Sequence, residues 1–254
     1  MTGVVIKMRI LAVAGASGGH IFPAVGLLEA AVASGEAADT LLVLPREINV
    51  AAESVASCRV RYIHVSNIKL SVDFHNFIAI VRYIKAFFEG VFIVLEFRPH
   101  VVVGFGSLVS IPLLIPAWLF RIRTIIHEQN VVPGRANRLL SLFVDKIALS
   151  FEETKNYLKI SSSKMALTGN PLRKDMVILE KKEALGFFGL KPHKKTVLVM
   201  GGSRGSVRIN NEFVKAVGLL KDREEIQVIH LSGENEKERL KIEYSRLGVE
   251  ARVF

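Results

Sequence analysis

One local pattern occurs twice in this chain and strongly limits the folds open to it: an apolar, β-rich run, a loop of small residues, and then a helical pattern. The first copy reads ILAVAGASGGHIFPAVGLLEA over residues 10–30, and the second reads TVLVMGGSRGSVRINNEFVKAV over residues 196–217. A strand that turns through glycines into a helix is the opening unit of a doubly wound α/β fold. Each copy therefore predicts the start of a parallel sheet.

Further apolar strands follow the first copy. Runs rich in Val, Ile and Leu recur at residues 40–45, 60–66, 100–106, 124–130 and 146–150, with helical stretches between them. Such continuous runs are typical of parallel sheets covered on both faces. Turn chemistry at Gly169-Asn170-Pro171 then separates the two copies. We therefore expect two domains, residues 1–168 and 169–254, the second with about three strands and so only one half of a doubly wound sheet.

A long apolar segment, residues 74–97, interrupts the alternation and predicts a helix. Arg82, Lys85 and Glu89 fall on one narrow stripe, and most other positions are apolar. Three charges argue against a helix that spans a membrane. Two interpretations stay open: a helix buried between other elements, or one that docks on lipid with Lys69, Arg82 and Lys85 near anionic head groups.

Net charge and cysteine content narrow the function classes. The 254 residues carry a formal net charge of +10, which suits phosphorylated ligands, an anionic membrane or nucleic acid. The sequence has no motif of a nucleic-acid-binding domain, so we expect no nucleic acid partner. Cys58 is the single cysteine, which rules out an internal disulfide and a cysteine zinc site. The first residues run into a strand without the cleavage pattern of a signal peptide.

Three glycine-rich loops follow predicted strands: residues 15–20, 104–107 and 201–206. Glycine lets the backbone approach an oxyanion, and the helix that follows points free N–H groups at it. The first loop does not fit the glycine spacing of a dinucleotide site, and no acidic residue ends the next strand. The Walker lysine and hydroxyl pair is also missing. The loops therefore predict phosphate binding of another kind, and we expect neither a cofactor nor a metal.

Two side chains stand out as acid–base candidates. His20 closes the first loop at the start of a helix, where an imidazole can accept a proton or bond to a substrate. Glu128 lies in the polar stretch HEQN at the end of a predicted strand. A structural histidine and a solvated carboxylate are the simpler interpretations, and both stay open.

With these residues in hand, the chain resembles the MurG family of bacterial glycosyltransferases. The family's sequence marks occur in order: AGASGGHIFPAVGLLEA, VVVGFGSLVSIP, IIHEQNVVPGRANRLLS, LTGNPLR and VMGGSRGSVRIN. The resemblance implies a GT-B fold, with two Rossmann-like lobes, of which the second is incomplete here because family members continue beyond the position of Phe254. It also implies a hexosyltransferase of peptidoglycan synthesis at the cytoplasmic face of the bacterial plasma membrane.

The reaction implied by the resemblance moves N-acetylglucosamine from UDP-N-acetylglucosamine to the muramoyl sugar of an undecaprenyl-diphosphate-linked acceptor, with inversion. His20 would be the catalytic base, and Glu128 its rival or support. The residues implied to contact UDP-N-acetylglucosamine are Ser17, Gly18, Gly19, Asn130, Arg173 and Ser203. Those implied to hold the acceptor diphosphate are Gly15, Gly18, Gly19, Gly104, Gly106 and Ser107.

Departures from the family pattern keep alternatives open. Ala16 and Ser17 stand where the family usually has glycine and threonine, and Arg204 stands where glutamine is usual. One alternative is a non-catalytic fragment that binds the membrane and the lipid acceptor. Another is a different GT-B enzyme, such as a sugar-nucleotide epimerase.

Overall fold

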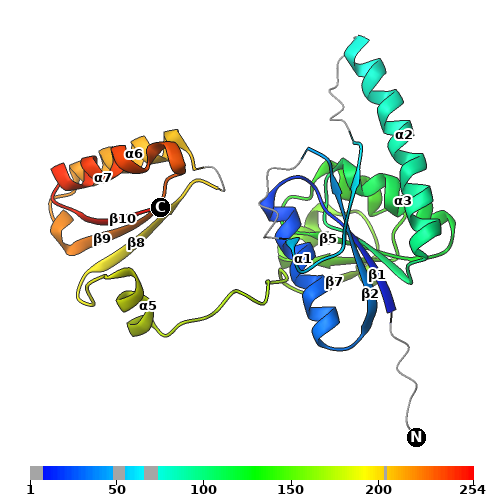
Figure 1. Cartoon of the computed structure of the whole chain (residues 1–254), viewed down its shortest axis with the longest axis horizontal. Coiled ribbons are helices and arrows are strands. Elements are labelled where there is room, and N and C mark those ends of the chain that lie inside the picture. Colours follow the sequence, from blue (N-terminus) through cyan, green and yellow to red (C-terminus); the bar gives the residue numbers. More distant parts are fainter. Residues whose placement is uncertain (1–7, 48–54, 66–73, 203–204) are drawn as a thin grey trace, which may run out of the picture. The chain divides into compact units, whose positions relative to one another are not determined.

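The computed structural model describes residues 8–47, 55–65, 74–202 and 205–254, and of residues 74–80 it describes the backbone alone. The chain divides into two compact units, Met1–Met176 and Val177–Phe254, named unit 1 and unit 2 below. Each is an α/β unit with its own parallel sheet and its own core (Figure 1).

Unit 1 holds a seven-stranded sheet in the order β3-β2-β1-β4-β5-β6-β7, with every pair parallel. Its strands are β1 (Met8–Val13), β2 (Ala37–Pro45), β3 (Val60–Ile63), β4 (Val101–Gly104), β5 (Arg123–Glu128), β6 (Lys146–Leu149) and β7 (Met165–Leu167). Its helices are α1 (Gly18–Ala33), α2 (Phe74–Phe97), α3 (Ile111–Leu119) and α4 (Arg135–Leu140). The strand order reverses between β1 and β4, which is the switch point of a doubly wound sheet.

Both faces of this sheet are covered. On one face α1 buries Ile21, Val25 and Leu28 against the strands. On the other, α2, α3 and α4 pack side chains such as Ile93, Leu113 and Leu140 into a second core layer. This burial explains why the strands read as unbroken apolar runs.

Helix α1 begins at Gly18, inside the first glycine-rich stretch of the sequence, residues 15–20. Ser17 has extended backbone angles, and its carbonyl accepts hydrogen bonds from the N–H groups of His20 and Ile21 at 3.0 Å. The first turn therefore forms before Pro23, which the helix includes although proline cannot donate a hydrogen bond. As a result, His20 lies within the first turn of α1.

The predicted helix over residues 74–97 is confirmed as α2. Gly90 lies where α2 crosses α3, so close that an added Cβ would stand 1.9 Å from the Pro112 carbonyl oxygen. From Val81 onward, one side of α2 is buried, with Ala86 and Ile93 in the core. The opposite side exposes an apolar stripe: Val81, Ile84, Phe88, Phe92 and Leu95. Within the described residues, no helix is long and apolar enough to cross a membrane.

The units divide after Met176, not after Thr168 as the turn chemistry suggested. The reason is that the segment after Gly169 lies along α1 and belongs to unit 1. The His127 Nε2 and the Gly169 carbonyl oxygen are 2.9 Å apart, and the Lys174 N–H donates to Glu29 Oε2 at 3.0 Å. Strand β7, just before this segment, is too short and too exposed to have given a strand pattern.

Unit 2 contains a parallel three-stranded sheet in the order β10-β9-β8. Its elements are α5 (Lys181–Phe188), β8 (Lys195–Met200), α6 (Val207–Leu219), β9 (Ile226–Leu231), α7 (Lys237–Arg246) and β10 (Glu250–Val253). Residues from α6 and α7, including Val217, Leu240 and Tyr244, bury one face of the sheet. The arrangement is one half of a doubly wound sheet, as the sequence predicted.

Candidate active site

The first two glycine-rich loops meet at the switch point of unit 1. Loop 1 (residues 14–17) leaves β1, and loop 2 (residues 105–107) leaves the neighbouring β4, so both lie at the carboxyl edge of the sheet. A Cβ added to Gly15 would stand 2.6 Å from the Ser107 Cβ, which requires glycine there. Ligands of open α/β sheets bind at this edge. The contact between the two loops places their backbones beside the amino end of α1.

The His20 ring is held between the two loops. Its Nδ1 lies 2.9 Å from Ser17 Oγ. A Cβ on Gly106 would make a tight contact of 3.1 Å with His20 Nε2, and the φ of +84° at this position favours glycine. Ser107 itself has φ +68°, an unusual conformation for a residue with a side chain. The two loops therefore fix the position of one imidazole.

Burial governs the protonation of His20. It lowers the pKa of His20 below the ordinary value of 6.5, and the negative charge of Glu128 offsets part of that effect. The imidazole is therefore neutral at neutral pH. If Nδ1–H donates to Ser17 Oγ, the Nε2 lone pair is free to accept a proton from a bound hydroxyl group.

Glu128 has a different environment from that of His20. It is 1% exposed, and its carboxylate accepts four hydrogen bonds at 2.8–3.1 Å, from Asn130 N and Nδ2, Gly134 N and Asn137 Nδ2. A carboxylate that accepts this many hydrogen bonds is held in one orientation. Its geometry suits the fixing of the loop before α4 better than proton exchange with a substrate.

Several polar atoms around this loop are buried without a partner in the described structure: Nδ1 of His127, Oε1 of Gln129 and Oδ1 of Asn137. Asn137 Nδ2 lies 3.6 Å from the position of a Cβ on Gly106, which places this side chain behind loop 2. Buried polar groups normally bond to protein, water or ligand. The unpaired atoms therefore mark this edge as one that ordered water or ligand completes.

Arg173, expected at the donor, lies over α1 in unit 1. Its guanidinium carbon is 4.5 Å from the centre of the Phe22 ring, and its Nη2 lies 3.3 Å from Asp175 Oδ2. Asn130 is exposed, with its side-chain amide held by Glu128.

The third glycine-rich loop leads into α6 in unit 2. Ser206 caps that helix by accepting a hydrogen bond from the Ile209 N–H at 3.4 Å. Ser203, the residue of this loop expected to contact the donor, lies outside the described residues.

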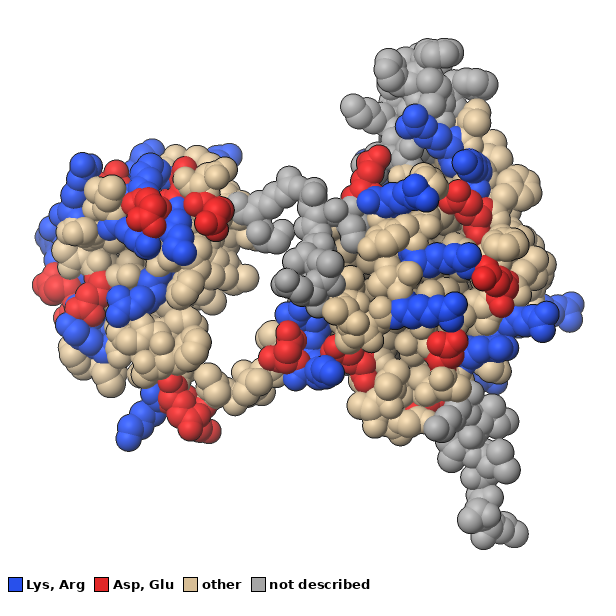
Figure 2. Space-filling view, viewed as in Figure 1, with Lys and Arg blue, Asp and Glu red and all other residues tan. Residues whose placement is uncertain are grey.

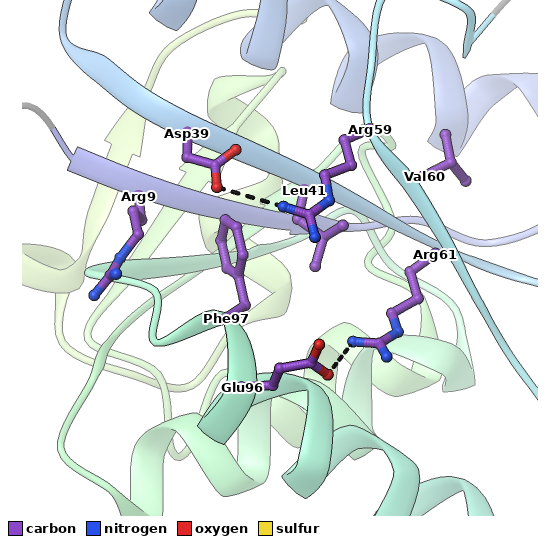
Figure 3. A pocket seen from close by; sticks show the side chains of 8 residues that line it. All are labelled: Arg9, Asp39, Leu41, Arg59, Val60, Arg61, Glu96 and Phe97. Carbon is purple, nitrogen blue, oxygen red and sulfur yellow. Dashed lines mark hydrogen bonds and ion pairs between the residues drawn. The ribbon is translucent and has the colours of Figure 1, made fainter.

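A separate cavity of about 420 Å³ opens at the other, amino edge of the sheet (Figure 3). Arg59 pairs with Asp39 at 3.6 Å there, and Arg61 pairs with Glu96 at 2.5 Å. Most of its charged side chains thus already have a partner of opposite charge, and no described residue of the glycine-rich loops lines it. The carboxyl edge is the better candidate.

The structure brings together most of the predicted residues of unit 1. Those that gather at the carboxyl edge are Gly15, Ser17, Gly18, Gly19, His20, Gly104, Gly106, Ser107, Glu128 and Asn130. Sequence reasoning missed Asn137 and Thr154, whose hydroxyl donates to the Asn130 carbonyl at 3.1 Å. Asn137 lies inside one of the quoted family marks, but its spacing alone gave no reason to single it out.

Comparison with known protein families identifies the family of this chain. Residues 10–149 match the glycosyltransferase family 28 N-terminal domain, which spans more than half of the chain, and residues 196–254 match the glycosyltransferase family 28 C-terminal domain. The chain belongs to glycosyltransferase family 28. Both of its units therefore carry a matched part of the family 28 architecture.

Two curated relatives illustrate the similarity within family 28. One from Alkaliphilus metalliredigens (strain QYMF) is 34% identical over 242 residues, covering 94% of this chain and 65% of the relative. One from Bacillus subtilis (strain 168) is 34% identical over 246 residues, covering 95% and 66%. Both are named UDP-N-acetylglucosamine--N-acetylmuramyl-(pentapeptide) pyrophosphoryl-undecaprenol N-acetylglucosamine transferase. These names bear out the resemblance to MurG, and the chain spans about 65% of the relatives' length.

Solved structures confirm the expected GT-B fold. MurG of Acinetobacter baumannii superposes with a TM-score of 0.70 at 19% identity, covering 97% of this chain and 68% of that one. UDP-GlcNAc 2-epimerase from Neisseria meningitidis, bound to UDP-GlcNAc, gives 0.60 at 16% identity, covering 97% and 72%. Because a transferase and an epimerase of this fold both match, the fold by itself does not choose between their reactions.

Proposed function

We propose that this family 28 chain takes part in moving N-acetylglucosamine from UDP-N-acetylglucosamine to the 4-hydroxyl of the muramoyl sugar on undecaprenyl diphosphate. The observation that carries the proposal is the neutral His20 imidazole, held between two glycine loops that suit a diphosphate. The names of the curated relatives supply the substrate class.

In the proposed mechanism, His20 Nε2 takes the proton of the 4-hydroxyl as its oxygen attacks the anomeric carbon of the donor. The bond to UDP breaks on the opposite side, so the configuration inverts. Gly15, Gly18 and Gly19 present backbone to the acceptor diphosphate, and the free N–H groups at the start of α1 face its charge. Glu128 keeps the adjacent loop and Asn130 in place.

Turnover of a muramoyl-diphosphate lipid acceptor by the 254-residue chain tests the proposal. His20→Ala should lower kcat by about 10²–10⁴-fold, the usual contribution of a general base. His100→Gln is the matched control, because His100 is exposed and lies at the opposite edge of the sheet. Since the pKa of His20 is lowered, the wild-type rate should stay constant above neutral pH and fall as acid protonates the imidazole.

The outcomes separate the proposal from its alternative. A His20→Ala variant with a near-normal rate would remove His20 from the mechanism. Acceptor binding without any turnover, and without calorimetric binding of UDP-N-acetylglucosamine, would favour the non-catalytic acceptor-binding function instead.

Peripheral attachment to the cytoplasmic face of the bacterial plasma membrane is the second part of the proposal. The apolar stripe of α2 includes Phe88 and Phe92, which are 66% and 62% exposed. Arg46, Arg82 and Lys85 line a small cavity between the end of β3 and α2. Figure 2 shows lysine and arginine side chains gathered on unit 1 alongside α2, with single acidic residues among them. An apolar stripe flanked by cations suits an anionic lipid surface.

Co-sedimentation with phosphatidylglycerol-containing vesicles tests this attachment. Replacing Phe88 and Phe92 together by serine should weaken binding at least tenfold, since each buried phenylalanine contributes on the order of 1.5–3 kcal/mol. Leu219→Ser is the control, because Leu219 is also exposed but lies in unit 2. Equal loss in both variants, or binding that survives in the Phe88/Phe92 variant, would contradict docking through α2.

A further inference from the structure

Four residues on one side of α1 form the surface on which the last segment of unit 1 packs. Gly18, Phe22, Gly26 and Glu29 are spaced by four, four and three residues, so they share one face of the helix. The segment over residues 169–175, named the strap here, lies along this face.

The backbone of the strap touches α1 at Gly26. A Cβ added to Gly26 would stand 2.7 Å from both the carbonyl carbon and the oxygen of Leu172. The strap is therefore so close to the helix that no residue larger than glycine fits at position 26. Because Leu172 precedes Arg173, this contact sets where the arginine side chain begins.

The side chain of Arg173 then stacks on an aromatic ring that itself rests on Gly18, the first residue of α1. Its guanidinium carbon lies 4.5 Å from the centre of the Phe22 ring. A Cβ on Gly18 would stand 2.9 Å from Cε2 of the same ring. Phe22 is thus placed between Gly18, at the amino end of α1, and Arg173. Stacking of this kind leaves the N–H groups at the edge of the guanidinium available for phosphate oxygens.

Glu29 holds the far end of the strap. Its Oε2 accepts from the Lys174 N–H at 3.0 Å, and its Oε1 accepts from the Ser57 hydroxyl at 2.7 Å. Burial by itself would raise the pKa of Glu29, but these two hydrogen bonds and the charges of Lys174 and Arg173 outweigh it and leave the pKa lowered. The carboxylate is therefore ionised and bound at neutral pH, which anchors the residue after Arg173.

We propose that Phe22 is a positioning residue: it keeps the Arg173 guanidinium on the side of α1, next to its first turn, where that group binds the diphosphate of the nucleotide sugar. Glu29 supports it by fixing the strap. The proposal rests on the proposed function for the identity of the ligand, but the stacking geometry does not depend on it. The ion pair between Arg173 and the exposed carboxylate of Asp175 is weak enough for a phosphate to replace it.

Binding measurements on the 254-residue chain test the coupling, with inorganic pyrophosphate and UDP-N-acetylglucosamine as probes. Phe22→Leu keeps an apolar side chain but removes the aromatic face, and should raise Kd about threefold to tenfold. Phe22→Tyr should restore the wild-type Kd. In an Arg173→Ala background, Phe22→Leu should have no further effect, since it acts through the arginine. Phe151→Leu, at an exposed phenylalanine of unit 1, is the control.

Nuclear magnetic resonance tests the stacking without any ligand. The ring current of Phe22 should shift the Arg173 side-chain resonances upfield in the wild type and in Phe22→Tyr, and the shift should vanish in Phe22→Leu. Unshifted wild-type resonances, additive losses in the double variant, or no pyrophosphate binding by the wild type would each overturn the proposal. Pyrophosphate binding coupled through Phe22 without binding of the nucleotide sugar would instead contradict the proposed function alone.

Discussion

Units 1 and 2 begin with the same strand, glycine-rich loop and helix, but the serine before the helix makes different hydrogen bonds in the two units. In both, a glycine-rich loop follows the first strand and a serine precedes the helix. The Ser17 hydroxyl in unit 1 bonds to the ring of His20, whereas the Ser206 hydroxyl in unit 2 accepts from the Ile209 backbone N–H. The loop of unit 1 therefore orients a titratable group, while that of unit 2 completes its own helix.

The two sheets also differ in how far they are covered. In unit 1 helices pack on both faces, and residues such as Leu113 are fully buried. In unit 2 Val197 and Val199 face α6 and α7, but the alternate residues of β8, Leu198 and Met200, are 57% and 58% exposed. The two units thus begin with the same strand, loop and helix pattern, but their sheets are not buried to the same extent.

The largest expected difference between the units follows from this burial. Leu113→Ala removes a fully buried side chain from unit 1 and should lower its free energy of unfolding by about 2–5 kcal/mol. Leu198→Ala in unit 2 should change stability by less than about 0.5 kcal/mol, because its side chain already meets solvent. Hydrogen exchange read by mass spectrometry reports each unit separately. Similar losses of protection in both variants would mean that the exposed face of β8 is covered in solution.

Two helical glycines should respond in opposite directions. Gly90→Ala places a Cβ against the Pro112 carbonyl and should destabilise unit 1 by about 1–3 kcal/mol, by pushing α2 away from α3. In Gly218→Ala the new Cβ would make an ordinary 3.6 Å contact with Leu247, so the helix preference of alanine should stabilise unit 2 by about 0.4–1 kcal/mol. The same exchange measurement checks both signs. A neutral Gly90→Ala would show that the helices can separate without cost.

Much of the fold could be predicted from sequence because its causes are local. Glycine loops after apolar runs located β1, β4 and β8, and the apolar length of residues 74–97 gave α2 its full extent. The glycine spacing did not show that α1 starts inside the first loop, where the Ser17 carbonyl accepts hydrogen bonds from the first turn. The predicted domain boundary lies before the division between the units, because a turn sequence does not show that the residues after it pack along α1.

Only some residues of the candidate site could be predicted from the sequence. His20 and the glycine positions stood out through spacing, since loops after neighbouring strands must meet at one sheet edge. The four donors around Glu128 come from residues up to nine positions away, and no local pattern shows them converging. Likewise, Phe22 and Glu29 read as ordinary helix positions, and they gain a role only from a segment far along the chain.

The smallest expected effects compare the two serines directly. Ser206→Ala removes a helix cap and should lower the stability of unit 2 by about 0.5–1 kcal/mol, whereas Ser17→Ala should change the stability of unit 1 by only a few tenths, because Ser17 makes no side-chain cap bond. Ser17→Ala should instead change the His20 ring. Without the hydroxyl as acceptor, the tautomer with a proton on Nδ1 loses its partner, and the Nε2-protonated form should increase. Imidazole ¹⁵N shifts measure the two forms. An unchanged tautomer ratio would mean that Ser17 donates to Nδ1, which would leave Nε2 protonated and unable to act as the base.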